Sequence, residues 1–152
     1  MYHAIVKRIS HRNFERVNQH EDEAVLRACV PTIQHRFGGS HALGGQRNDV
    51  EGLRRWFARM HRLTPTLHLT VTDVWVKGLP HDTTIIIRWT ATQDEVTLDG
   101  TPYVNHGVHI IKMRWLKVVS IDANEDSQAV ENFLRAAAAR GVAEATAVPI
   151  TT

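Results

Sequence analysis

The stretch LHLTVTDVWV, residues 67–76, decides the fold class of this chain. Its side chains alternate between apolar and polar and it is rich in Val and Thr, which is typical of a half-buried β-strand. Just upstream, residues 50–63 carry apolar side chains every three or four positions, the spacing of an amphipathic helix. The change of period after Pro65 therefore predicts a helical first part followed by a β-sheet.

Three more strands are expected downstream of residue 76. Gly78–Asp82 is rich in turn-forming residues and precedes TTIIIRWTAT, residues 83–92, which alternates again. A second turn at Asp99-Gly100 separates this strand from the segments 103–114 and 118–123. The pattern predicts a meander of antiparallel strands.

The flanking segments are expected to be mostly helical. Helical spacing starts near Val6, and Glu21 opens a second short helix that Pro31 ends, followed by a short strand over residues 33–37. The loop 38–45 holds four glycines. Asn48, with Glu51 three residues later, resembles a capping box at the start of the third helix.

A last helix is predicted from Asp126 or Ser127 to Gly141. We therefore expect one α+β domain over residues 1–141 and a flexible C-terminal tail over 142–152.

A strongly bent antiparallel sheet wrapped around the helices would form a cone with an internal cavity. Apolar residues on the outer face of such a sheet would need a partner, so a homodimer is expected.

Composition narrows the class of protein further. A chain of 152 residues is long enough to bury a hydrophobic core. Its content of 43% hydrophobic and 22% charged residues is typical of folded proteins and argues against intrinsic disorder. Its single cysteine, Cys29, excludes an intramolecular disulfide and suits a reducing compartment. No apolar run reaches the roughly 18 residues of a spanning helix. We expect a cytoplasmic protein without a membrane partner.

The net charge of +2 is too small to indicate nucleic-acid binding. Four arginines at positions 54, 55, 59 and 62 gather on the third helix, and a solvated helix face is the simplest interpretation of them. Phosphate-binding motifs are missing. We therefore expect neither nucleic acid nor nucleotide as a partner.

The whole pattern resembles the nuclear transport factor 2-like fold, also called cystatin-like, and within it the SnoaL-like group. The residues that carry the resemblance are HALGG at 41–45, RWF at 55–57, IRWTAT at 87–92, DGTPYVNHGVH at 99–109 and EDSQA at 125–129. The resemblance implies the cone fold. One departure is Trp115-Leu116-Lys117 where relatives commonly place a Gly in the last hairpin. This departure concerns the turn type rather than the fold.

The same fold carries several activities, so the resemblance leaves the function open. It hosts polyketide cyclases, ketosteroid isomerases, scytalone dehydratase, epoxide hydrolases and transport or binding modules without catalysis. For this chain it implies a pocket for an apolar carbonyl compound and, if the protein is an enzyme, cofactor-free cyclisation, isomerisation or dehydration. The alternative is a binding or dimerisation module of the same fold. A cavity of several hundred Å³ with convergent polar groups would favour the enzyme.

Two candidate proton-transfer residues follow from the resemblance. His35 lies about where ketosteroid isomerases have their Asp base, and a neutral imidazole can also accept a proton at neutral pH. The alternative is a histidine that only fills the inner wall of a strand. Asp122 is the nearest match to the Asp that SnoaL-like cyclases use on the final strand. If Ala123 points inward instead, Asp122 is an exposed carboxylate.

Residues Asn105, Gly107 and His109 share one face of their strand because side chains alternate with period two. Asn105 and His109 are therefore candidates to hold a carbonyl or enolate oxygen by hydrogen bonding. His106 and His109 point to opposite faces and cannot share a metal ion. No other cluster has ligand spacing, so we expect no metal and no cofactor.

Large apolar side chains would form the walls of the pocket. The candidates for ligand contact are Phe37, Trp56, Met60, Trp89 and Tyr103. Ordinary core packing explains most of these residues equally well.

Overall fold

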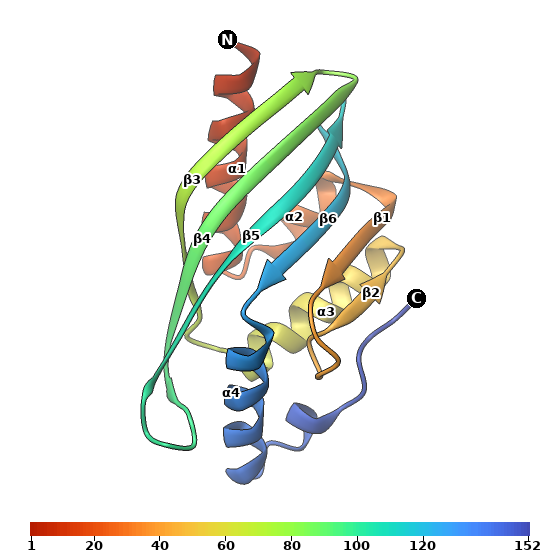
Figure 1. Ribbon diagram of the computed structural model, residues 1–152. Helices are drawn as coiled ribbons and strands as arrows, with labels where there is room; N and C mark the ends of the chain where they lie inside the picture. Colours follow the sequence, from red (N-terminus) through yellow and green to blue (C-terminus); the bar gives the residue numbers. More distant parts are fainter.

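The computed structural model describes all residues from Met1 to Thr152, and it confirms the α+β class (Figure 1). Four α-helices and a six-stranded sheet make up the fold. The helices are α1 (Tyr2–Asn18), α2 (Asp22–Arg27), α3 (Val50–Leu63) and α4 (Ser127–Ala139). The strands are β1 (Cys29–Phe37), β2 (Gly45–Arg47), β3 (His68–Leu79), β4 (Asp82–Val96), β5 (Pro102–Arg114) and β6 (Lys117–Glu125).

The sheet is curved and open, with the strand order β2-β1-β6-β5-β4-β3. Strands β3 to β6 form the predicted antiparallel meander. One pair departs from the expected antiparallel sheet, because β1 runs parallel to β6. The first strand of the chain lies beside the last one, so the chain between them must cross the molecule, and helix α3 lies in that crossover.

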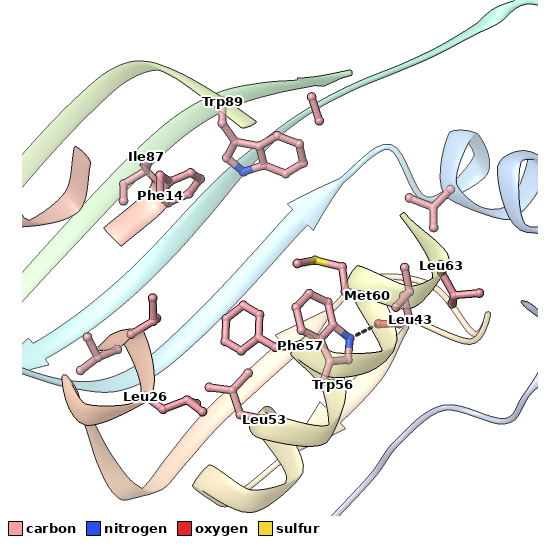
Figure 2. Packing of buried hydrophobic residues seen from close by; sticks show 14 of the residues in the cluster. Phe14, Leu26, Leu43, Leu53, Trp56, Phe57, Met60, Leu63, Ile87 and Trp89 are labelled. Carbon is pink, nitrogen blue, oxygen red and sulfur yellow. Dashed lines mark hydrogen bonds between the residues drawn. The ribbon is translucent and has the colours of Figure 1, made fainter. Parts of the chain in front are cut away.

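The helices cover one side of the sheet (Figure 1). Helix α1 packs against β3, α3 against β1, and α4 against β5. Figure 2 shows Trp56, Phe57 and Met60 of α3 on one side of the core, with Phe14 of α1 and Trp89 of β4 on the other. These residues belong to a single buried apolar cluster. No helix is both long and apolar enough to cross a bilayer.

Side-chain caps fix where two helices begin. Helix α3 begins after Asp49, whose carboxylate accepts a hydrogen bond from Gly52 N at 2.6 Å. The cap is therefore one residue later than the expected Asn48. Helix α4 begins after Asp126, whose side chain accepts from Ala129 N at 3.2 Å.

The segment 142–152, expected as a flexible tail, instead packs against the domain. It contains the 3-10 helix η1 (Ala143–Thr146), in which Ala145 is buried. The guanidinium of Arg59 donates a hydrogen bond to Val148 O at 2.8 Å. Apolar contact and a charged donor on α3 thus hold this segment, and its small residues gave no periodic pattern that would predict either.

Strands β5 and β6 are joined by a two-residue turn without glycine. Trp115 and Leu116 both have positive φ, at 51° and 64°, which is the backbone of a type I′ hairpin turn. Trp115 N also donates to Pro80 O at 2.6 Å in the neighbouring turn. Residues with large side chains seldom adopt a positive φ, and this hydrogen bond holds the turn at Trp115.

Candidate functional site

A cavity of about 130 Å³ lies between the inner face of the sheet and helices α1, α3 and α4. Its lining residues include no Asp, Glu, Lys or Arg, and most of them are hydrophobic. The volume is well below the several hundred Å³ expected for a drug-sized ligand. It is close to the roughly 150 Å³ of an engineered apolar cavity that binds benzene. A space of this volume suits an uncharged molecule of about one ring.

All five residues predicted to contact a ligand line this cavity, namely Phe37, Trp56, Met60, Trp89 and Tyr103. The indole of Trp56 is fixed by a hydrogen bond from Nε1 to Leu43 O at 2.8 Å (Figure 2). Four of the five also belong to the buried core, and Phe37 packs against it. The wall of the cavity and the hydrophobic core are thus the same side chains.

His35 lines the cavity from β1 and is only 2% exposed. Its ring lies 4.6 Å from the ring of Trp56, centre to centre. Its Nδ1 is sealed from solvent and has no hydrogen-bond partner. Burial holds the pKa of His35 well below its usual range, and the nearby charge of Arg47 lowers it further. The ring is therefore neutral at neutral pH.

His109 lines the same cavity from β5. Its Nδ1 accepts a hydrogen bond from Nε1 of Trp89 at 2.7 Å, and the ring of Phe14 packs against it at 5.3 Å. Burial lowers the pKa of His109 to about 4, and the charge of Asp122 offsets part of that effect. The structure thus brings together two neutral imidazoles that the sequence analysis proposed separately.

Asn105 also faces inward, but its side-chain amide is fully hydrogen-bonded to other protein atoms. Its Nδ2 donates to the Tyr103 hydroxyl at 2.9 Å and to Asp126 O at 3.2 Å. Its Oδ1 accepts from the backbone N–H groups of His106 and Asp126 at 2.7 and 3.1 Å. With both donors in use, Asn105 ties β5 to the start of α4. Neither amide donor is therefore left free for a substrate oxygen in this arrangement.

Tyr103 differs from Asn105, because its hydroxyl accepts a hydrogen bond from that amide and donates to no protein atom. Burial raises the pKa of Tyr103 to about 12, so the hydroxyl stays protonated. Its O–H is a free donor at the α4 end of the cavity.

Asp122 lies on the opposite face of β6 from the cavity. Its carboxylate pairs with Arg36 at 2.5 Å, and its side chain is 41% exposed. Ala123 is the residue that points inward, and it is fully buried. Of the two orientations that the sequence left open, the structure shows the one in which Ala123 points inward and Asp122 lies outside the cavity.

Arg47 is a buried residue that the sequence analysis did not single out. It is fully buried on β2, directly across from His35 on β1, with its guanidinium 5.5 Å from the ring centre of Trp56. Nη2 donates to Gly44 O at 3.1 Å, whereas Nε and Nη1 have no partner. Burial lowers the pKa of Arg47 to about 10. It lies behind the cavity wall, and a three-residue strand is too short for periodicity to reveal its burial.

Metal binding finds no support in the side-chain arrangement. His106 is exposed on the outer face of β5, opposite to His109. No group of three His, Cys, Asp or Glu side chains is placed to hold a metal ion.

Comparison of the sequence with known protein families identifies the family of this chain. The sequence profile of the SnoaL-like domain matches residues 11–121, which is most of the chain. The chain belongs to the SnoaL-like domain family. Among curated protein sequences, none matches this SnoaL-like chain.

Solved structures with the same fold include an NTF2-like protein of unknown function from Burkholderia pseudomallei. It is 12% identical, with a TM-score of 0.67, over 84% of this chain and 95% of that one. A cystatin-like protein from Xanthomonas campestris is 13% identical, with a TM-score of 0.64, over 82% and 93%. TerC, co-crystallised with polyporic acid, is 18% identical, with a TM-score of 0.63, over 80% and 92%. At these identities the likeness of the SnoaL-like chain to its neighbours shows the fold alone.

Proposed function

We propose that this SnoaL-like protein binds a small uncharged carbonyl compound and shifts one of its protons between carbon and oxygen. The observation that carries the proposal is the pair of neutral imidazoles, His35 and His109, in one mostly apolar cavity without charged lining residues. An imidazole can accept or donate a proton at neutral pH, and a dry site strengthens each hydrogen bond to a ligand.

In this proposal His35 acts as the base and His109 as a hydrogen-bond donor. The unprotonated ring nitrogen of His35 takes a proton from the carbon next to the carbonyl group. The Nε2–H of His109 donates a hydrogen bond to the carbonyl oxygen, on which negative charge develops. Return of the proton from His35 to that oxygen gives the enol and restores the neutral ring.

The electrostatics of the site limit the substrate. The low pKa of His35 makes it a weak base. A carbon between two carbonyl groups is acidic enough for such a base, whereas a simple ketone is a poor match. The small cavity adds a size limit of about one six-membered ring, since its volume is slightly below that of the cavity that binds benzene.

Two further considerations support a small-molecule role. The resemblance to polyketide cyclases and ketosteroid isomerases implies acid–base chemistry on carbonyl compounds without a cofactor. The structural neighbour TerC was co-crystallised with polyporic acid, an organic molecule.

The test uses acetylacetone, a 1,3-dicarbonyl compound whose enol absorbs ultraviolet light. Interconversion of its keto and enol forms after dilution into water is followed by absorbance, with and without protein. We expect the purified protein to accelerate it, and His35→Gln to remove the acceleration. Asp122→Asn is the matched control and should keep the rate, because Asp122 lies outside the cavity.

The second candidate is a binding module without turnover, and the absence of an ionised acid or base from the cavity lining favours it. The same experiment separates the two. Saturable binding of acetylacetone with an unchanged rate of interconversion would refute the enzyme and support the module. A lack of binding would refute both.

For the outer face of the sheet we propose a second copy of this chain as the partner. Trp75, Ile86 and Ile110 lie side by side in one row across β3, β4 and β5, and each is at least 37% exposed. The next row carries Asp73 and Arg88, so the face offers both signs of charge to a copy related by a two-fold axis. Light scattering after size exclusion should give a dimer, and Ile86→Lys should give a monomer. A monomeric wild-type protein at micromolar concentration would refute this proposal.

A further inference from the structure

Trp89 lies unusually close to the neighbouring strand. It is directly opposite Gly107 on β5, and a Cβ at Gly107 would lie 2.5 Å from Cζ2 of Trp89. The missing side chain leaves room for the indole beside β5, and Figure 2 shows the indole pointing into the core. From there Nε1 reaches Nδ1 of His109, two residues further along β5, at 2.7 Å.

The direction of this hydrogen bond is fixed by chemistry. An indole N–H only donates, so Nδ1 of His109 must be the acceptor and carry no proton. Burial keeps the ring neutral. A neutral imidazole without a proton on Nδ1 carries it on Nε2, and His109 makes no other hydrogen bond to the protein that would compete.

We propose that Trp89 is a positioning residue that holds His109 as the Nε2–H tautomer, so that the cavity presents a fixed N–H donor and selects ligands with an oxygen acceptor. The ligand selectivity rests on the proposed function, in which His109 contacts the carbonyl oxygen. The tautomer itself depends only on the contact between the two side chains. The two parts can therefore be tested separately.

Trp56 provides a matched comparison. It lines the same cavity and is also held by an indole N–H, but this bond goes to Leu43 O rather than to a histidine. Replacement of either tryptophan by Phe removes one N–H and part of a ring from the wall. Only Trp89→Phe removes the hydrogen bond to His109.

The first measurement is the ring ¹⁵N NMR spectrum of labelled protein, in which protonated and unprotonated nitrogens differ widely in chemical shift. His109→Gln identifies the resonances of His109 by their loss. We expect Nδ1 to be unprotonated and Nε2 protonated in the wild type and in Trp56→Phe, and a mixture of tautomers in Trp89→Phe. A proton on Nδ1 in the wild-type protein would overturn the proposal without any variant having to fold.

The second measurement compares cyclohexanone with methylenecyclohexane, which has the same shape but lacks the oxygen. We expect Trp89→Phe to weaken cyclohexanone binding relative to the hydrocarbon by about twofold, because an equal mixture of tautomers halves the fraction of protein that presents the Nε2–H donor. Trp56→Phe should change both affinities by a similar factor. An equal loss for both ligands in Trp89→Phe would overturn the selectivity. If the wild type binds neither ligand, the proposed function fails, while the NMR result still decides the tautomer.

Discussion

Acidification should destabilise this protein partly through His109, and the size of the effect follows from its surroundings. Burial lowers the pKa of this ring from its ordinary value of 6.5 to about 4 in the folded protein. The unfolded chain therefore binds a proton first as the pH falls. The stability that His109 contributes is complete above about pH 6.5 and is lost as the pH falls toward about 4.

The size of the pKa shift of His109 determines how much stability is lost on acidification. Between about pH 7 and about pH 4.5, this one group should remove about 2 kcal/mol from the free energy of unfolding. The His109→Gln variant has no titrating group at this position, while its side-chain oxygen can still accept the Trp89 N–H. The variant should therefore lose about 2 kcal/mol less on acidification than the wild type, whatever its stability at neutral pH.

Urea denaturation followed by tryptophan fluorescence at both pH values measures the difference. The comparison between two proteins cancels the contributions of the other titrating groups. His106→Gln is the control, because His106 lies on the same strand but on its exposed face. If His109→Gln and the wild type lose equal stability on acidification, the buried neutral state of His109 is refuted.

Three further predictions concern other parts of the site. Asp122→Asn should lower the free energy of unfolding by less than about 1 kcal/mol in urea denaturation, because its ion pair is exposed; a larger loss would contradict the outward placement. Gly107→Ala should cost about 2 to 4 kcal/mol by the same measurement, since its methyl group would collide with both Trp89 and the backbone oxygen of Asn124; a stability within about 0.5 kcal/mol of the wild type would show that the indole and strand β6 can both move aside. Arg47→Met should raise the pKa of His35 in an NMR titration by removing a nearby positive charge, with Arg47→Lys as the charge-preserving control; an unchanged pKa would refute that influence.

The fold could be predicted because its main signals are long. The strands β3, β4 and β5 each span 12 or more residues, so their period of two is easy to detect. Strand β2 has only three residues and follows a glycine-rich loop, so no period exists to be read. The sequence pattern assigns the first residues of β1 to the preceding helix, because Pro31 is expected to end that helix. In the structure Pro31 lies within an irregular stretch of the β1–β6 pairing. Proline has no backbone N–H, and here no hydrogen bond between the strands is lost for that reason.

The candidate site was predictable only to the level of which face a side chain takes. Alternation along β5 predicted that Asn105 and His109 share a face, and the structure shows that this face is the inner one. It could not show that Asn105 spends both its donors on Tyr103 and Asp126, because these partners come from elsewhere in the fold. On β6, an error of one residue exchanged Asp122 for Ala123.

The chemistry of this cavity depends on which polar groups remain free once the fold has used the others. Of the groups that line it, Asn105 is consumed by the junction with α4, whereas His35, His109 and the Tyr103 hydroxyl each keep an atom available. None of these three carries a charge at neutral pH, since burial opposes ionisation in each. A site built from neutral donors and one weak base can bind a carbonyl group firmly but can deprotonate only an already acidic carbon. The same burial that makes the cavity selective for uncharged ligands therefore also limits the reaction that it can catalyse.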